Sequence, residues 1–497
     1  MKIRTRFLSI AAILLAASVV QGGLESRTRE ILQAGGLTNA SFSVMAVDLS
    51  NNQTLIAINP DEPMIPASNM KLITTAAALN VLGPDFMFET RLLLADGGVL
   101  VVRGDGDPGF ADPKLMKKYG TEVKNVEQLL EAWVAAVANA APKQLNRLAV
   151  DDRIFDDQFV HPTWPRNQLN NWYCAQVAGL NFFDNCLMVY VSPTVTGESP
   201  HVQMVPHVPD LETFNRARTG KRNRFGIDRT LDTNHFTFHG EVHRRTAPHW
   251  VTVHDPPLLF GRILADRITQ GTGIKVAMVD RATAEDRFAN AKVLHRVRTH
   301  MALVLERCNK HSQNLFAEAL LKRMGRHYTG TRGGWLNGAA AVRAFLSQRA
   351  LGPAAASVTI ADGSGLSRDN RITARILVKL LAHMHADKQR GEPFKNSLPV
   401  GGGEGSLAKR FTRNIHAKVL GKTGWIKGVG ALSGYLEFPA ATAPGGAESS
   451  PRTVAYCILI NDSPLANSQM KRLQDRIVRL IDEAVVLNNR HETVADN

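Results

Sequence analysis

The stretch that decides the fold of this 497-residue chain is Pro66-Ala67-Ser68-Asn69-Met70-Lys71-Leu72. It opens an apolar run with helical texture that continues to about Leu82, so Ser68 lies where a helix begins. Residues three apart share one face of a helix, and the ammonium of Lys71 can therefore reach the hydroxyl of Ser68 and take its proton. The positive end of the helix favours an oxyanion that develops at this serine. The stretch predicts a serine nucleophile with a lysine base.

Two further short motifs follow in a fixed order. Ser312-Gln313-Asn314 lies in a helix-rich segment, and Lys422-Thr423-Gly424 precedes a core strand, where the glycine lets a ligand approach the backbone. The Ser-x-x-Lys spacing alone is weak, because it recurs at Ser406 and Ser468. Ser68 is the one that is followed downstream by both other motifs, and this trio is typical of serine β-lactamases and penicillin-binding proteins.

Longer segments make the resemblance more specific. The chain resembles the low-molecular-mass class C penicillin-binding proteins, the D-Ala-D-Ala carboxypeptidase/endopeptidase group. Besides the serine segment, four segments are similar to that family: residues 314–318, 362–368, 398–402 and 431–435. The insertion of roughly 200 residues between the first and second motifs is also typical of the group. The resemblance covers nearly the whole chain after its first residues.

The resemblance implies a role for each catalytic residue. Ser68 attacks the carbonyl between two D-alanines and forms an acyl-enzyme. Lys71 is the general base, for which its pKa must fall, and Lys422 is a candidate for the second cation that lowers it. Ser312 relays a proton towards the leaving amine. Asn314 orients the substrate amide and Lys71.

The same resemblance assigns the substrate-binding groups. The third motif, Lys422, Thr423 and Gly424, holds the terminal carboxylate of the substrate. The backbone N–H groups of Ser68 and Trp425 form the oxyanion hole. Trp425 stands where the family usually has serine or threonine, so the indole is expected to narrow the cleft without removing the N–H group. The indole of Trp425 is therefore expected to affect substrate size and turnover more than the class of reaction.

The expected fold class is α+β: the serine β-lactamase/DD-peptidase (transpeptidase-like) fold, with an antiparallel sheet flanked by helices and an inserted β-rich region. Short strand-like runs and turns begin near Phe88, and helical texture returns near Glu285. The expected division is a signal peptide over 1–22, the first part of the DD-peptidase domain over 23–87, the insertion over 88–289 and the second part over 290–497. The two parts of the peptidase domain are expected to share one sheet.

The N-terminal segment and the net charge limit the classes of partner that the protein is expected to bind. The first residues are basic and are followed by an apolar run from Phe7 to Val20, which fits a signal peptide and a final location in the periplasm or cell-wall space. The net charge of +14 suits an anionic partner surface. Export argues against nucleic acid, so the expected partners are peptidoglycan stem peptides, with β-lactam antibiotics as covalent inhibitors and peripheral membrane association as a further candidate.

No cofactor and no metal are expected. The four cysteines show no C-x-x-C spacing, and Cys174 and Cys186 remain candidates either for a disulfide or, with more weight, for buried thiols. His235, His239 and His243 share strand parity, but residues four apart on a strand are too distant to bind one ion, so they are interpreted as surface histidines.

Two other functions stay open. The first is a serine β-lactamase or esterase on the same scaffold, which would need a deacylating carboxylate near Ser68 that the sequence does not single out. The second is a catalytically inactive wall-binding protein. Its only support is Trp425, because the principal motif residues are all present: Ser68, Lys71, Ser312, Asn314 and Lys422.

Overall fold

The structure, a computed structural model, describes residues 22–120, 123–440 and 451–495. The expected signal peptide lies outside these ranges, apart from residue 22. The chain divides into two compact units. The first unit contains residues 1–84, 305–312 and 339–497, and the second contains residues 85–304 and 313–338. Within the described ranges, no helix is long and apolar enough to cross a membrane.

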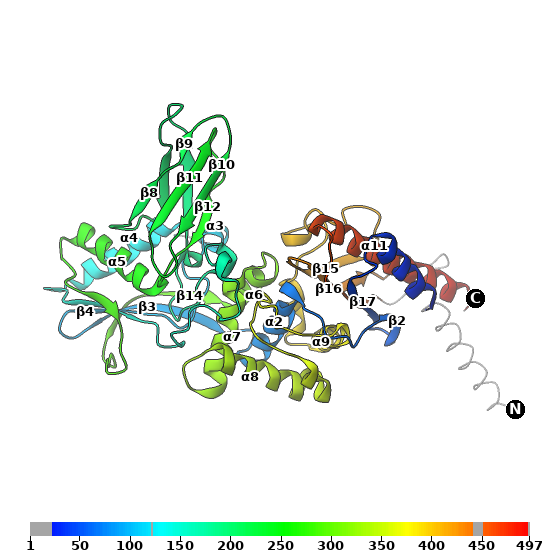
Figure 1. Cartoon of the computed structure of the whole chain (residues 1–497). Helices are drawn as coiled ribbons and strands as arrows, with labels where there is room; N and C mark the ends of the chain where they lie inside the picture. Colours follow the sequence, from blue (N-terminus) through cyan, green and yellow to red (C-terminus); the bar gives the residue numbers. More distant parts are fainter. Residues whose placement is uncertain (1–21, 121–122, 441–450, 496–497) are drawn as a thin grey trace. The chain divides into compact units, whose positions relative to one another are not determined.

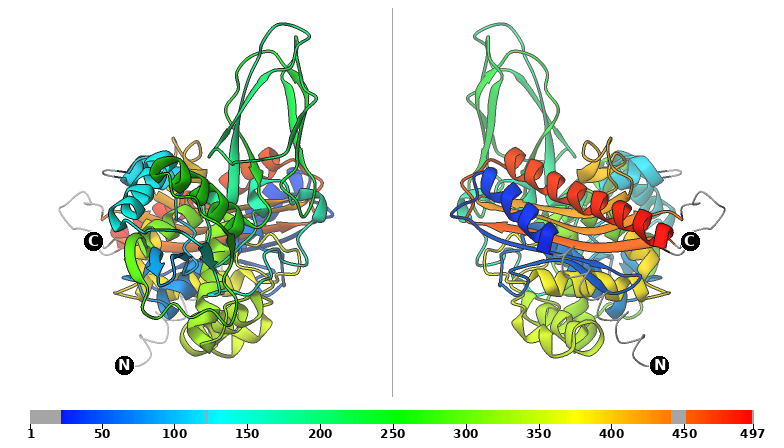
Figure 2. Two further views of the ribbon diagram at one scale, coloured as in Figure 1. Left: turned by 90° about the vertical axis from the view of Figure 1, so that its left-hand side faces the viewer. Right: turned by 90° about the vertical axis from the view of Figure 1, so that its right-hand side faces the viewer.

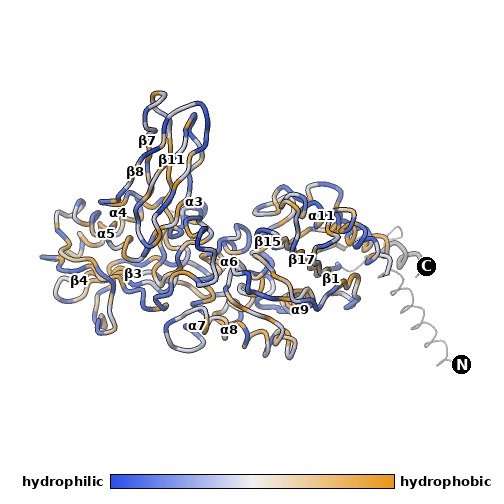
Figure 3. The backbone as a smooth tube through the Cα atoms, viewed as in Figure 1, coloured by the Kyte–Doolittle hydropathy of each residue, from blue (hydrophilic) through white to orange (hydrophobic). Residues whose placement is uncertain are grey.

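The first unit is built on one five-stranded antiparallel sheet. Its strand order is β15-β16-β17-β1-β2. The strands are β1 (Ser41–Asp48), β2 (Gln53–Ile58), β15 (Lys418–Ile426), β16 (Val429–Phe438) and β17 (Arg452–Asn461). Because β1 pairs directly with β17, the two ends of the chain share this sheet, with Ser41 opposite Asn461. Almost every residue of its strands β16 and β17 is buried, as expected of a sheet that is covered on both sides. Figure 3 colours the backbone by residue hydropathy.

Helices cover both faces of this sheet. On one face, the helix over residues 22–34 and α11 (Asn467–Ala495) lie side by side (Figure 2, right). Their leucines and isoleucines pack with the strands in one apolar core that includes Leu32, Leu432 and Ile477. On the other face lie α2 (Met70–Val81) and α9 (Ala374–Ala386). The α2 helix carries the serine segment, so its N-terminus is held against the sheet.

The second unit contains three sheets and several helices (Figure 1). A five-stranded sheet, in the order β13-β5-β4-β3-β14, packs against α4 and α5. Its strands are β3 (Met87–Ala95), β4 (Val99–Arg103), β5 (Arg147–Asp151), β13 (Val279–Arg281) and β14 (Lys292–His300). The helices are α3 (Pro113–Tyr119), α4 (Val126–Ala140), α5 (Pro256–Thr272) and α7 (Asn314–Thr329).

Two smaller sheets complete the second unit. One has the order β12-β6-β7, and the other is built on β10-β11-β8, with β9 also paired to β11. Their strands are β6 (Cys186–Ser192), β7 (His201–Val205), β8 (Thr213–Asn215), β9 (Arg218–Thr219), β10 (Arg224–Arg229), β11 (Phe236–Val242) and β12 (His249–Thr252). Two of the expected surface histidines contact carboxylates: His235, just before β11, lies 3.0 Å from Glu212, and His239 on β11 lies 3.1 Å from Asp228. All four cysteines are buried thiols.

The fold class agrees with the prediction, but the division of the chain differs in two places. The second unit continues beyond the expected boundary at 289 because β14 pairs along its length with β3. Residues 313–338 also belong to the second unit, since the buried ammonium of Lys322 on α7 donates to Asp156 at 2.8 Å and to the carbonyl of Gln158 at 2.6 Å. The insertion is also less purely β-rich than expected, because α4 and α5 form part of its core.

Candidate active site

The nucleophile segment begins with a tight turn. Residues Ala67–Asn69 form a 3-10 turn that leads into α2, and Ala67 has a positive φ of 44°. Strained backbone of this kind is concentrated at functional sites. The Nζ atom of Lys71 lies 3.1 Å from the Oγ atom of Ser68. Lys71 is fully buried and also donates to the carbonyl oxygen of Ser364 at 2.9 Å. The expected pair of Ser68 and Lys71 is therefore formed, and the hydrogen bond to Ser364 holds the Lys71 ammonium in place.

A buried turn supports this pair. It spans residues 362–367 and is organised by the carboxylate of Asp362, which accepts from the N–H groups of Gly365 and Ser367. Gly365 has a φ of +83°, and a side chain there would meet the carbonyl oxygen of Ala67 at 1.8 Å. This glycine therefore lets the turn pack directly against the nucleophile segment.

Strand β15 lies against the same segment. The side chain of Asn69 donates to the carbonyl of Lys422 at 2.7 Å and accepts from the hydroxyl of Ser433 at 2.8 Å. A Cβ atom on Gly424 would lie 3.0 Å from both the carbonyl oxygen of Pro66 and the backbone nitrogen of Ser68. The absence of a side chain at Gly424 is thus what allows β15 to approach the backbone of the nucleophile.

Lys422 connects the second and third motifs. Its Nζ atom donates to the hydroxyl of Ser312 at 2.9 Å and to the carbonyl of Thr423 at 2.8 Å. Burial holds the pKa of Lys422 well below its usual range, and the nearby positive charge of Lys71 lowers it further. Ser312 has a positive φ of 58°, a second strained residue at the site. Ser312 therefore accepts from a lysine whose charged form is disfavoured by burial, and an incoming carboxylate would stabilise that charged form.

One small cavity joins these groups. It has a volume of about 160 Å³ and is lined by the expected site residues Ser68, Ser312, Thr423, Gly424 and Trp425. The Trp425 side chain is 51% exposed. Two cationic residues that sequence reasoning did not single out, Arg410 and Lys471, also line the cavity. The three motifs thus meet at one cleft. It carries the hydroxyls of Ser68, Ser312 and Thr423 and the half-exposed indole of Trp425, and Arg410 and Lys471 add positive charge.

The second motif is divided between the units. Ser312 belongs to the first unit, whereas Gln313 and Asn314 belong to the second. There the Asn314 amide donates to the carbonyl of Tyr173 at 2.8 Å. The expected role of Asn314 beside Lys71 stays a prediction.

Several supporting groups were missed by sequence reasoning. The Ser364 carbonyl acts through the backbone, which no side-chain pattern reveals, although the segment 362–368 that contains it is similar to the family. Asn69 lies inside the quoted serine segment but was given no role. Ser406 accepts a 2.8 Å hydrogen bond from the hydroxyl of Thr423, and nothing in the sequence around it indicated this contact.

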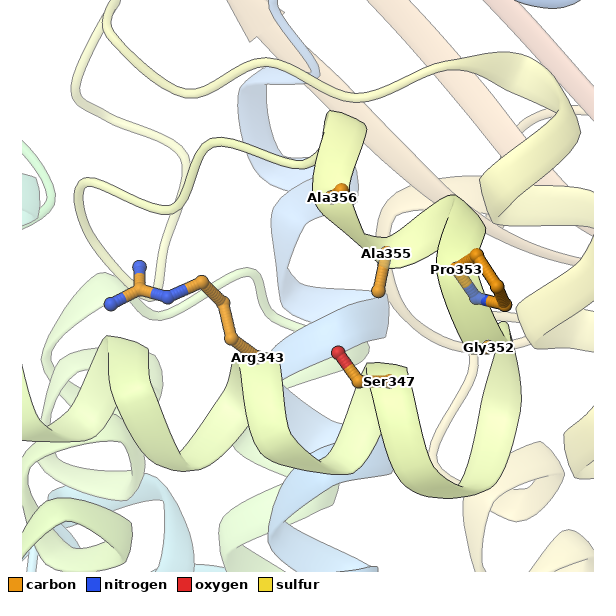
Figure 4. Close-up of a pocket in the computed structure, with 6 residues that line it drawn as sticks. All are labelled: Arg343, Ser347, Gly352, Pro353, Ala355 and Ala356. Atoms are coloured by element: carbon orange, nitrogen blue, oxygen red, sulfur yellow. The ribbon is translucent and has the colours of Figure 1, made fainter.

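A larger cavity in the first unit does not have this chemistry. Its volume is about 450 Å³, and it lies at the C-terminal end of α8 (Trp335–Phe345). Figure 4 shows the hydroxyl of Ser347 pointing towards Ala355, while the guanidinium of Arg343 extends away from both. None of the expected site residues lines it, so the smaller cavity at Ser68 is the candidate active site.

Comparison with known proteins settles the family. The model of the D-Ala-D-Ala carboxypeptidase 3 (S13) family matches residues 24–484. The chain belongs to this family. It is therefore a D-Ala-D-Ala carboxypeptidase of the serine hydrolase type, and the family predicted from the sequence motifs is confirmed.

Individual relatives of this S13-family carboxypeptidase support the same family. A D-alanyl-D-alanine carboxypeptidase from an Actinomadura species is 31% identical over 430 residues, which cover 82% of this chain and 77% of the relative. DacB from Haemophilus influenzae, also a D-alanyl-D-alanine carboxypeptidase, is 23% identical over 427 residues, 80% of this chain and 82% of the relative.

Solved structures support the fold. Penicillin binding protein 4 from Haemophilus influenzae aligns with a TM-score of 0.73 at 20% identity and covers 91% of this chain and 99% of its own. The same protein in complex with a novel β-lactam aligns with a TM-score of 0.67 at 20% identity, covering 92% and 99%. The S13-family carboxypeptidase thus has the DD-peptidase fold that its motifs predicted.

Proposed function

We propose that this S13-family enzyme cleaves the D-Ala-D-Ala bond of peptidoglycan stem peptides, as a carboxypeptidase and endopeptidase, through an acyl intermediate on Ser68. The observation that carries the proposal is the 3.1 Å contact between Lys71 Nζ and Ser68 Oγ at the cleft that also contains Ser312 and Gly424. A nucleophile within hydrogen-bond reach of its base is the geometry that covalent catalysis needs.

The first half of the reaction forms the acyl-enzyme. Neutral Lys71 accepts the proton of Ser68 as its Oγ atom attacks the carbonyl carbon. The negative charge that develops on the carbonyl oxygen is stabilised by the backbone N–H groups of Ser68 and Trp425. The C–N bond then breaks as Ser312 passes its proton to the departing amine. The proton that Lys71 took from Ser68 replaces it on Ser312, so Lys71 is neutral again. In the second half, Lys71 activates a water molecule that hydrolyses the ester and restores Ser68.

The two buried lysines, Lys71 and Lys422, have different roles in this mechanism. Burial and the nearby charge of Lys71 both lower the pKa of Lys422, so the charged forms of the two lysines disfavour each other. The terminal carboxylate of a substrate would keep the proton on Lys422, to which Thr423 adds a hydroxyl, and would leave Lys71 as the base. We assign the orientation of the substrate amide to Asn314.

The location and inhibitors follow from the same proposal. A stem-peptide hydrolase works where its polymer is, so we propose export to the periplasm or cell-wall space through the basic and apolar first residues. β-Lactams, which resemble D-Ala-D-Ala, would acylate Ser68. The strongly basic chain is also suited to peripheral association with an anionic membrane face.

The test is the release of D-alanine from a soluble pentapeptide that ends in D-Ala-D-Ala. The purified protein should release one D-alanine per peptide, and Ser68→Ala should release none while keeping its thermal midpoint. Release that persists in Ser68→Ala would contradict the proposal. Rapid turnover of penicillin by a protein that leaves the pentapeptide intact would instead indicate a β-lactamase.

A further inference from the structure

A second cavity with concentrated charge lies wholly within the second unit. Its volume is about 400 Å³, and five arginines line it: Arg91, Arg103, Arg153, Arg326 and Arg332. We refer to it as the arginine cavity. Nothing in the reaction described above uses these side chains.

The sheet itself brings the arginines together. Arg91 on β3 lies opposite Arg103 on β4, and Arg103 lies opposite Asp151 on β5. The other neighbour of β3 in the sheet is β14, and there Arg296 lies opposite Arg91. Residues directly opposite on neighbouring strands project from the same face of a sheet. The register therefore places a row of three guanidinium groups and one carboxylate across four strands.

The carboxylates in the cavity are outnumbered. Asp151 accepts from Arg103 at 2.9 Å and from Arg153 at 2.7 Å. Glu89 accepts from Arg298 at 2.7 Å and is also paired with Arg91. Each of these two carboxylates is thus shared by at least two guanidinium groups.

The third acid of the lining also faces an arginine. Asp105 lies 4.0 Å from Arg323. Arg326 hydrogen-bonds to the carbonyl of Gly330 and forms no ion pair among the described residues. Arg332 is paired at 2.8 Å with Asp157, which lies outside the lining. The lining itself has five arginines against three carboxylates, an excess of positive charge.

The guanidinium groups are both fixed and reachable. Contacts with an aromatic ring restrict two of the side chains. The Cζ atoms of Arg103 and Arg153 lie over the ring of Phe288, 5.9 and 5.8 Å from its centroid. The side chains of Arg91 and Arg103 are nonetheless 43% and 33% exposed. Planar guanidinium forks that are partly exposed at a cavity match the geometry of carboxylates and phosphates.

We propose that the arginine cavity binds the carboxylates of peptidoglycan stem peptides, as a second contact with the polymer in addition to the cleft at Ser68. The identity of the polymer rests on the proposed function, whereas the preference for oxyanions rests on the arginines alone. An anionic membrane surface fits less well. The lining has a single large apolar side chain, Ile154, and none of its residues is a large exposed hydrophobic group that could enter a bilayer.

Direct anion binding tests the cavity itself. Calorimetry of the full chain with citrate as the probe, at low salt, should give measurable binding for the wild type. The double variant Arg91→Gln with Arg103→Gln should bind citrate at least about tenfold more weakly, because charge-assisted hydrogen bonds are lost. It should keep the wild-type thermal midpoint, since Glu89 retains Arg298 and Asp151 retains Arg153.

Two further variants serve as controls. Arg222→Gln with Arg244→Gln removes the same charge from exposed positions of the second unit outside the cavity and should leave citrate binding unchanged. The lysine pair Arg91→Lys with Arg103→Lys keeps the charge but loses the planar forks, and should bind at an intermediate strength. Equal citrate binding by the wild type and the Gln double variant of Arg91 and Arg103 would overturn the proposal.

Co-sedimentation identifies the polymer, in a Ser68→Ala background that prevents digestion. Binding to purified sacculi should fall in the Gln double variant of Arg91 and Arg103, and in the parent when sacculus carboxyl groups are amidated. Removal of phosphodiester-linked polymers with hydrofluoric acid should have no effect. If binding is lost only after hydrofluoric acid, or if the double variant loses binding only to phosphatidylglycerol vesicles, the stem-peptide assignment is wrong.

Soluble substrate separates this proposal from the proposed function. In the catalytically intact chain, the Gln double variant should hydrolyse the soluble pentapeptide at the wild-type rate. Failure of every form to hydrolyse that peptide would refute the proposed function and leave the citrate result standing.

Discussion

Gly424→Ala is a direct test of how closely β15 must approach the nucleophile. The new Cβ atom would lie 3.0 Å from the Pro66 carbonyl oxygen, 3.0 Å from the Ser68 nitrogen and 3.1 Å from the Ala431 Cβ atom. Ordinary contacts are about 3.5–4.0 Å, so β15 must shift by roughly half an ångström. Two of the three obstructing atoms are backbone, which cannot rotate away. We expect a loss of about 1–3 kcal/mol in the free energy of unfolding.

The catalytic loss should exceed what stability alone explains. The shift moves the backbone N–H group of Trp425 relative to Ser68, and a displacement of about 1 Å can cost 10²-fold in rate. We expect kcat/KM for a D-Ala-D-Ala peptide, and the rate constant for penicillin acylation, to fall roughly ten- to hundredfold together, because both reactions use one oxyanion hole. Stopped assays with the peptide and a fluorescent penicillin measure the two rates.

Gly430→Ala provides the matched control in the same sheet. Its new Cβ atom would also meet an atom at 3.0 Å, but that atom is the flexible Met470 sulfur. This variant should fold and react like the wild type. If Gly424→Ala also acylated at the wild-type rate while remaining folded, close approach of β15 would not be required for the reaction.

Three further results are expected. Lys71→Ala should lose both acylation and hydrolysis by about 10²–10⁴-fold, the usual cost of a missing general base, and acylation at the wild-type rate would exclude it as the base. Lys422→Ala should lose most kcat/KM for carboxylate-ended peptides, whereas Trp425→Ser should stay active and accept a wider range of substrates; a Trp425→Ser variant as inactive as Ser68→Ala would show that the cleft is assigned wrongly. Burial raises the pKa of Asp107 to about 7, so the folded state holds a proton that the unfolded chain has lost, and stability should fall as the pH rises from about 4 to 7 by at most about 1.4 kcal/mol per pH unit. Asp107→Asn should reduce the pH dependence of stability measured by thermal unfolding. An unchanged pH dependence would show that Asp107 is not the group responsible.

Strands of the central sheet were predictable from the sequence. Alternation predicts a strand at 42–49, and strand-like runs predict two more at 431–438 and 453–461; these are β1, β16 and β17. The order of the three motifs then predicted the residues that line the cleft, because a nucleophile helix and an edge strand must meet for the chemistry to occur. Side-chain identity at Ser68 and Gly424 carried that information.

Other features depended on tertiary pairing. Residues 293–300 were expected to be helical, but they form β14 because β3 offers them a partner strand. Helix α4 was missed although Leu129, Leu130, Trp133 and Val137 have helical spacing and are buried on one side of it. The arginine row could not be foreseen either, since it depends on the register of four strands from separate parts of the chain.

The most direct measurement is mass spectrometry of the penicillin-treated protein after proteolysis. We expect one covalent adduct per chain, on the peptide that contains Ser68, and no adduct in Ser68→Ala. An adduct confined to Ser406 or Ser468, the other two serines with a lysine three residues later, would contradict the assignment of the nucleophile and the mechanism built on it.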